Sequence, residues 1–256
     1  GWKLPFVVLA LLGGAYCVIV SRGVPEPPFG VRRGSERAGG STLEVQPQEV
    51  GQPLLDSASR WKFLMYMAAC HFLTMYSFTM MLTWLPYYLE TSVGFEAEMA
   101  AAIPGVMPLV MAPAAILWGA AADKRKDRNF VLWICLPVAG TAVALIPAAG
   151  SAALLVLALI LYGVTGKLAF DPILTAAVAE NSPPHAHGLF LGSFNFAACL
   201  AMVIAPSVTG LIAEKSGRFD VSFFMAGAFH LLALLALVQA RGSLSKRASR
   251  IQSERI

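Results

Sequence analysis

The sequence predicts an all-α integral membrane protein with about seven transmembrane helices. Hydrophobic residues make up 57% of the chain and charged residues only 13%, whereas soluble domains carry about 25% charged residues. The apolar residues gather in long runs, each of about the length that a ~30 Å hydrocarbon core requires. The charged residues lie between these runs, so the net charge of +4 reports membrane orientation and does not indicate a nucleic-acid-binding protein.

The first predicted span covers residues 5–20, so residues 1–22 form one membrane-spanning segment. Residues 23–60 are rich in Pro, Gly, Ser, Gln, Glu and Arg and contain no apolar run, which predicts a flexible cytoplasmic linker. The chain starts with Gly1 and shows no signal-peptide pattern. We therefore expect it to be a piece of a longer protein.

The second predicted span, residues 63–89, carries many groups that can form hydrogen bonds. Each such group must find a partner inside the bilayer, so we expect this helix to line a cavity. Four polar residues recur at three- and four-residue spacing and share one helix face: Tyr76, Thr79, Thr83 and Tyr87. Tyr76 and Thr79 lie nearer the middle of the membrane and are candidate substrate contacts. The alternative is that they only satisfy neighbouring helices.

Five further spans complete a predicted six-helix bundle over residues 61–240. The third span, residues 99–118, contains three prolines and should be kinked, because proline removes a backbone donor and clashes one turn back. The other four spans cover residues 129–147, 153–178, 188–213 and 221–240, and residues 241–256 form a basic cytoplasmic tail.

Residues 118–128 read W-G-A-A-A-D-K-R-K-D-R between two apolar runs, which predicts a tight cytoplasmic hairpin. The pattern formed by five of its residues resembles the loop signature of the major facilitator superfamily of transporters, G-x-x-x-D-R/K-x-G-R/K-R/K: Gly119, Asp123, Lys124, Arg125 and Arg128. Lys126 replaces the usual Gly, and Asp127 replaces a usual base. The alternative is a basic loop that only obeys the positive-inside rule.

This resemblance implies that the chain corresponds to helices 6 to 12 of a twelve-helix major facilitator, with residues 23–60 as the central loop. The run T-W-L-P-Y-Y-L at residues 83–89 is similar to the end of the seventh helix in the anion:cation symporter branch, whose members mostly carry organic anions. The resemblance also implies that Asp123 and the bases after it form a conformational latch. Gly119 would permit close helix approach, as would Gly188 and Gly192. Asn195 resembles an asparagine beside the cavity, and the alternative is that it forms a hydrogen bond to a neighbouring helix.

Lys167 lies near the centre of the fifth predicted span. A lysine at this depth costs about 2.5–3.5 kcal/mol on insertion scales and needs a partner or a wet cavity. Asp171, four residues on, shares its helix face. The pair is a candidate substrate or coupling site, and the alternative is a static ion pair that fixes packing. His71 is a candidate carrier of a coupling proton, because imidazole titrates near neutral pH; the alternative is a buried packing group.

The distribution of bases predicts the orientation. The spans alternate sides, so the linker, the segments after the third and fifth spans, and the tail share one side of the membrane. All but four of the 19 Lys and Arg residues lie in or beside these segments, the exceptions being Lys3, Lys167, Lys215 and Arg218. The base-rich side is cytoplasmic. We expect a multi-pass cell-membrane protein with its N-terminus outside and its C-terminus in the cytoplasm.

The sequence shows no nucleotide-binding loop, no Ser-His-Asp set and no metal-spaced cluster, so we expect neither an enzyme nor a cofactor. We predict secondary active transport of a small organic anion by alternating access, coupled to protons or sodium. The expected partners are the anionic substrate, the coupling ion, the lipid bilayer and a missing N-terminal half. Without that half, the isolated chain should not transport. The alternatives are a multidrug/proton exporter of the same superfamily and a seven-helix receptor.

Overall fold

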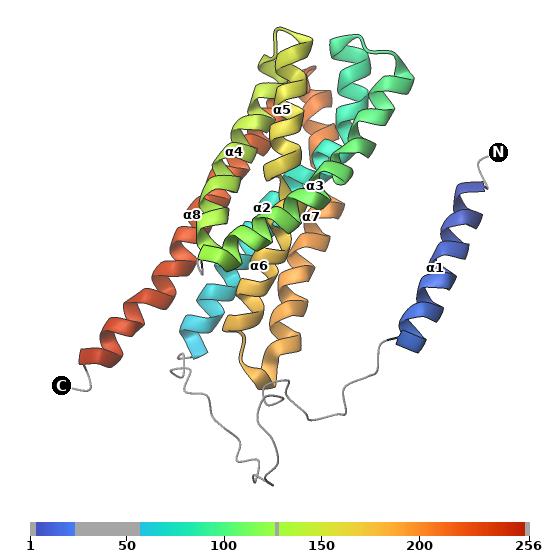
Figure 1. Cartoon of the computed structure of the whole chain (residues 1–256). Coiled ribbons are helices and arrows are strands. Elements are labelled where there is room, and N and C mark those ends of the chain that lie inside the picture. Colours follow the sequence, from blue (N-terminus) through green and yellow to red (C-terminus); the bar gives the residue numbers. More distant parts are fainter. Residues whose placement is uncertain (1–3, 24–56, 126–127, 254–256) are drawn as a thin grey trace. The chain divides into compact units, whose positions relative to one another are not determined.

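The computed structural model describes residues 4–23, 57–125 and 128–253, and these residues are almost entirely helical (Figure 1). The chain divides into two compact units, Gly1–Val50 and Gly51–Ile256. In the first unit, α1 (Leu4–Gly23) is a 20-residue helix, which confirms that the first apolar run is helical. Its described apolar stretch, Ala10–Ile19, is shorter than a full membrane span.

The second unit contains six helical segments that are long and apolar enough to cross a membrane. Five of the predicted spans form single helices, whereas the span predicted at residues 153–178 forms two. The elements in order are α2 (Ser57–Tyr88), the π-helical turn η1 (Leu89–Val93), α3 (Ala97–Arg125), α4 (Arg128–Ala148), α5 (Ala152–Thr165), α6 (Lys167–Asn181), the 3-10 turn η2 (Pro184–Ala186), α7 (His187–Ser216) and α8 (Asp220–Ser253).

Several helices extend beyond the predicted boundaries. The start of α2 at Ser57 makes residues 57–60 helical, although they were assigned to the flexible linker. Helix α8 continues to Ser253 through most of the segment predicted as a tail. The hydropathy pattern marks where the apolar environment ends, but a helix continues until a breaker stops it. The rest of the predicted linker lies outside the described residues.

Helices also extend into the segment predicted as a hairpin at residues 118–128. Helix α3 continues to Arg125 and α4 begins at Arg128, so Gly119, Asp123, Lys124 and Arg125 are helical residues. Alanine has the highest helix propensity, so the three alanines after Gly119 favour the continuation of α3 beyond the apolar run. Helix α3 also runs through Pro104, Pro108 and Pro113 without interruption.

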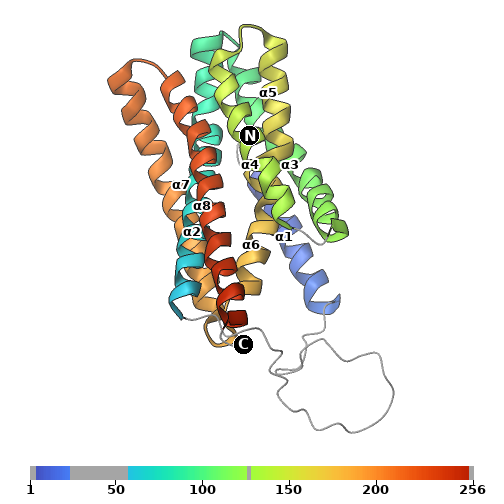
Figure 2. The ribbon, with the colours of Figure 1, turned by 90° about the vertical axis from the view of Figure 1, so that its left-hand side faces the viewer.

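Helix α2 lies at the centre of the bundle. It packs against α7 and α8, which Figure 2 shows beside it, while α4 packs against α5 and α8, and α3 packs against α5 and α6. The buried side chains form two clusters. One contains Tyr88, Leu155 and Tyr162, and the other contains Phe63, Phe170 and Phe194. The junction between α5 and α6 therefore falls between the two apolar clusters.

Close helix approach occurs at different glycines from those expected. A Cβ atom on Gly119, Gly188 or Gly192 would meet nothing within 4 Å among the described residues. By contrast, a Cβ on Gly140 of α4 would lie 2.9 Å from the carbonyl oxygen of Gly227 on α8, and a Cβ on Gly227 would lie 2.8 Å from the carbonyl oxygen of Gly140. The tightest described crossing of α4 therefore depends on two glycines on different helices, neither of which belongs to a Gly-x-x-x-Gly motif.

Candidate functional site

The fifth span is a broken helix, and the break lies at Gly166. This residue adopts an extended backbone, with φ −72° and ψ −178°, between the end of α5 and the start of α6. A Cβ atom here would lie 2.5 Å from the Tyr162 carbonyl oxygen and 2.9 Å from the Met111 terminal methyl. Only glycine fits this position without a shift. The sequence analysis missed the break, although a membrane segment interrupted by Gly and Pro is its usual signal.

Backbone groups at the end of α5 find partners despite the break. The Gly166 N–H donates to the Tyr162 carbonyl at 2.6 Å, and the Thr165 hydroxyl donates to the Leu161 carbonyl at 2.7 Å. The Trp118 indole N–H of α3 donates to the Val164 carbonyl at 2.8 Å. These bonds satisfy carbonyls that would otherwise be costly in a bilayer. At the start of α6, no side chain caps the helix.

Lys167, the first residue of α6, is buried in the bundle. Its side chain is only 1% exposed, and its Nζ atom donates to Asp171 Oδ1. Its Nζ atom also lies 5.7 Å from the centroid of the Phe170 ring, within cation–π range. The predicted pairing of Lys167 with Asp171 is thus present.

His71 of α2 lies on the other side of the same carboxylate. Its Nδ1 atom is 3.6 Å from Asp171 Oδ1, and its side chain is 4% exposed. This separation is longer than a hydrogen bond, and Nδ1 is buried without a hydrogen-bond partner among the described residues. The ring packs edge-on against Phe194 of α7, with centroids 3.9 Å apart. Since the Asp171 side chain is 33% exposed, it is the part of this cluster that a solute can reach.

Tyr76 and Thr79 lie further along α2 and do not join this cluster. The Tyr76 hydroxyl is buried and hydrogen-bonds the Thr209 hydroxyl of α7, with the oxygens 3.1 Å apart. The Tyr76 ring packs edge-on against Phe229. The partner of Tyr76 is therefore a neighbouring helix. Thr79 is half-buried, and no side-chain hydrogen bond involves it in the described part of the chain.

Asn195 is exposed on α7, next to the buried Phe194. Fourteen residues separate it from Thr209, which corresponds to about 21 Å along the helix. Asn195 and the Tyr76 hydroxyl therefore lie at different levels along the bundle. Within the described ranges, no protein group bonds to the Asn195 amide.

The residues of the loop signature lie at the end of α3 and the start of α4. Asp123, Lys124 and Arg125 are exposed on the last turns of α3. The Arg125 guanidinium lies 3.9 Å from the centroid of the Phe130 ring and so connects α3 to α4. Arg128 is the first residue of α4. Lys126 and Asp127 lie outside the described residues.

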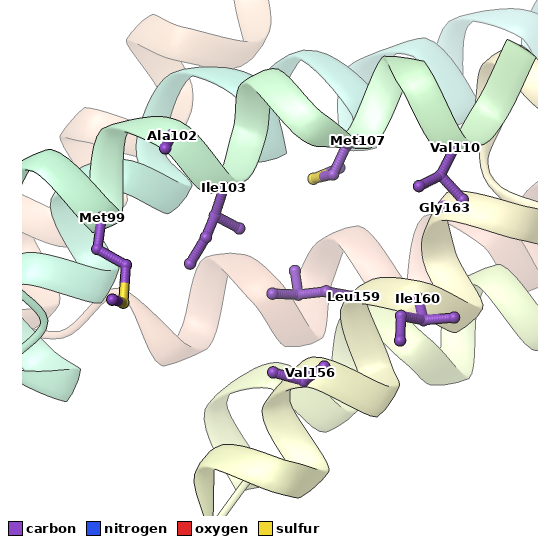
Figure 3. Close-up of a pocket in the computed structure, with 9 residues that line it drawn as sticks. All are labelled: Met99, Ala102, Ile103, Met107, Val110, Val156, Leu159, Ile160 and Gly163. Carbon is purple, nitrogen blue, oxygen red and sulfur yellow. The ribbon is translucent and has the colours of Figure 1, made fainter.

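An apolar groove of about 250 Å³ lies between the first half of α3 and helix α5 (Figure 3). Side chains of α3 such as Ile103 and Met107 face those of α5 such as Leu159 and Ile160. The groove is lined by nine residues, none of which has a polar side chain that could bind a charged solute: Met99, Ala102, Ile103, Met107, Val110, Val156, Leu159, Ile160 and Gly163. Within the described residues, no group of three His, Cys, Asp or Glu side chains is placed to hold a metal. The Lys167 cluster remains the best candidate for binding an anion.

Comparison with known proteins gives the family. The sequence model of the Major Facilitator Superfamily matches residues 1–206 and, in a second alignment, residues 138–254. The hexuronate transporter of Bacillus subtilis (strain 168) is 26% identical over 253 residues, which cover 93% of this chain and 57% of that protein. The probable galactarate/D-glucarate transporter GudP of the same organism is 24% identical over 266 residues, covering 96% of this chain and 58% of that protein.

Two further comparisons cover less of this chain. The multidrug resistance protein MdtG of Enterobacter lignolyticus (strain SCF1) is 29% identical over 176 residues, covering 66% of this chain and 41% of that protein. A crystal structure of the peptide transporter POT (E310Q mutant) in complex with sulfate superposes with a TM-score of 0.60 at 21% identity, covering 74% of this chain and 43% of that chain.

This chain thus spans little more than half the length of the first two relatives. The family match excludes the seven-helix receptor considered above and agrees with the expectation that the chain is not an enzyme. The chain, an all-helical multi-pass membrane protein, belongs to the major facilitator superfamily of transporters.

Proposed function

We propose that this chain is the C-terminal portion of a secondary transporter that moves a small organic anion by alternating access. The observation that carries the proposal is the buried Lys167 at the break between α5 and α6, paired with the partly exposed Asp171. Two of the relatives are named as transporters of hexuronate and of galactarate or D-glucarate, which are organic anions.

The electrostatics of the break favour an anion. A helix N-terminus carries about half a positive charge, and α6 begins at Lys167 without a side-chain cap. The Lys167 ammonium adds a positive charge near this end, which the Asp171 carboxylate balances while the two are paired. In transporters, such half-helix N-termini face the anionic groups of substrates. A substrate carboxylate would therefore compete with Asp171 for Lys167.

His71 provides a route for coupling to protons. When the imidazole is protonated, the Asp171 carboxylate gains a second cation at 3.6 Å. Its charge is then shared between His71 and Lys167, so its interaction with Lys167 is weaker. Lys167 then becomes available to the substrate. Loss of the proton returns Asp171 to Lys167 and releases the anion. A sodium ion bound by Asp171 would act in the same way, and the two ions are distinguished by the gradient that drives uptake.

The remaining half of the transporter completes this mechanism. We propose that residues preceding this chain supply the opposite wall of the cavity, which Thr79 and Asn195 line from this side. Asp123, Lys124, Arg125 and Arg128 would clamp the cytoplasmic side in one state. In this arrangement the N-terminus lies outside and the C-terminus lies in the cytoplasm.

Uptake of labelled D-glucuronate into proteoliposomes tests the proposal. The transporter that contains this chain is compared with its Lys167→Gln variant, with and without a pH or sodium gradient. We expect gradient-driven uptake that falls at least ten-fold in Lys167→Gln. Lys215→Gln, which removes an exposed base elsewhere, should leave uptake unchanged. Equal uptake by Lys167→Gln and the unmutated protein would show that the pair is only structural.

The similarity to the multidrug resistance protein MdtG favours one other candidate, a multidrug/proton exporter. An exporter of this kind would expel cationic dyes, and Lys167 would then serve only to pair with Asp171. Dye efflux from vesicles, together with no uptake of D-glucuronate, would select this function.

A further inference from the structure

A polar cavity lies at the opposite end of the bundle from the signature residues. It has a volume of about 420 Å³ and forms where α2 and α4 end and where α7 turns into α8. Six of its lining residues carry the argument: Tyr87, Thr91, Ser92, Arg218, Phe219 and Asp220. The orientation predicted from the bases places this end outside the cell. We call it the outer vestibule.

One wall of the outer vestibule is aromatic and firmly held. The Tyr87 and Phe219 rings lie with their centroids 5.3 Å apart, and Trp84 packs against Phe219 at 5.1 Å. The Trp84 indole N–H donates to the Pro206 carbonyl at 3.1 Å, which fixes this ring against α7. Tyr87 is nevertheless 50% exposed. The wall therefore presents an apolar aromatic surface to the cavity.

The other wall carries a paired charge. The Arg218 guanidinium donates from Nε and Nη2 to Asp220 Oδ2, at 3.1 and 2.5 Å. Gly217, with φ +67°, sets the left-handed turn that brings the two side chains together. The pair is neutral as a whole, and the Asp220 carboxylate also has the Tyr88 hydroxyl as a hydrogen-bond partner, but the guanidinium keeps unused N–H donors. Arg218 is 72% exposed, so these donors are accessible.

We propose that the outer vestibule binds the hydroxylated part of the substrate, a sugar-like ring or chain. Hydroxyl groups both donate and accept, so they match an Arg–Asp pair and the neighbouring Thr91 and Ser92 hydroxyls. The C–H face of a sugar packs on the Tyr87 and Phe219 rings. A carboxylate alone gains little here, because Asp220 already neutralises Arg218. This inference rests on the proposed function: the outer vestibule selects hydroxyls, and Lys167 then selects the negative charge.

Saturation-transfer NMR titrations of the transporter that contains this chain, in lipid nanodiscs, test the inference. Three probes separate the chemistries: D-glucose carries hydroxyls only, D-glucuronate carries hydroxyls and a carboxylate, and hexanoate carries a carboxylate only. We expect both sugars to bind with dissociation constants within a few-fold of each other, and hexanoate not to bind at the outer vestibule.

Variants then locate the binding site. Tyr87→Leu and Arg218→Gln should each weaken D-glucose binding about ten-fold, and both residues are exposed, so the fold should tolerate the changes. The matched controls are Tyr66→Leu at the other end of α2 and Lys215→Gln on the last turn of α7, which should leave binding unchanged. Absence of D-glucose binding to the unmutated transporter, or equal binding by all four variants, would overturn the inference.

The same titrations separate this inference from the proposed function. Lys167→Gln should bind D-glucose normally while losing D-glucuronate uptake in the transporter. If Lys167→Gln stops uptake but Tyr87→Leu and Arg218→Gln bind D-glucose normally, the outer-vestibule site is wrong and the anion transporter stands. If D-glucose binding depends on Tyr87 but no anion is transported, the outer vestibule stands and the proposed function fails.

Discussion

The Nδ1 atom of His71 and the Oδ1 atom of Asp171 lie 3.6 Å apart, across the contact between α2 and α6. The same carboxylate oxygen accepts the hydrogen bond from Lys167. One oxygen thus faces an ammonium group from its own helix and an imidazole from another. A shift of α2 relative to α6 would change which of the two groups it contacts.

Neutralising one member of the buried pair should cost more than neutralising both. Asp171→Asn leaves the Lys167 ammonium unpaired inside the bundle and should destabilise the chain by about 3–5 kcal/mol. The double variant Lys167→Met/Asp171→Asn removes the buried charge and should recover most of that loss. Thermal unfolding in detergent measures both. A double variant no more stable than Asp171→Asn would show that the unpaired ammonium is not the cause.

The indole of Trp118 should be required at the helix break. Trp118→Phe keeps an aromatic ring but leaves the Val164 carbonyl without its donor, which should cost about 1–3 kcal/mol. Trp133→Phe is the matched control, because its side chain is exposed and makes no described hydrogen bond. A lower midpoint of thermal unfolding is expected for Trp118→Phe alone. Equal midpoints would mean that water satisfies the carbonyl.

Because α4 and α8 cross closely at Gly140 and Gly227, a Gly→Ala substitution at this crossing should lower stability, whereas Gly→Ala at an open position should raise it. Gly227→Ala places a methyl group 2.8 Å from the Gly140 carbonyl oxygen and should lower stability by about 1–3 kcal/mol through overpacking. Gly192→Ala meets nothing within 4 Å, so helix propensity should raise stability by up to about 1 kcal/mol. Unfolding midpoints of the two variants would contradict this account if they moved in the same direction.

The Tyr76–Thr209 hydrogen bond should contribute about 0.6 kcal/mol. A double-mutant cycle with Tyr76→Phe and Thr209→Val measures this coupling free energy directly. If Tyr76 only fixes α2 against α7, Tyr76→Phe should leave the KM for uptake unchanged. A raised KM with unchanged stability would instead assign Tyr76 to the substrate.

The sequence predicted the spans well because membrane insertion imposes a length and an apolar composition on each of them. It could not predict where the helices end outside the apolar zone, as at Arg125 and Ser253, because hydropathy does not report helix termini. The pairing of Lys167 with Asp171 followed from their spacing on one helix. The position of His71 beside them did not, because it depends on how α2 crosses α6.

The glycines show the same limit. Sequence spacing drew attention to Gly188 and Gly192, which have open space around them in the described structure, whereas Gly140 and Gly227 are 87 residues apart and touch. Small-residue spacing along one helix shows that close approach is possible, but the partner helix decides where it occurs. The break at Gly166 was also missed, although Gly166 and Pro172 in one apolar segment are the usual signal of a broken membrane helix.

The break at Gly166 also bears on how the chain enters the bilayer during synthesis. Helices α5 and α6 have 14 and 15 residues, so each is about 21–23 Å long and too short to span a ~30 Å hydrocarbon core alone. They must be inserted together, with the backbone groups at the break between them left outside the regular helical hydrogen bonding. Trp118, whose indole N–H donates to the Val164 carbonyl at the break, is translated 46 residues before Val164. The hydrogen-bond donor is therefore synthesised before the carbonyl that it binds. No helix that follows α6 is needed to give the Val164 carbonyl a hydrogen bond in the membrane.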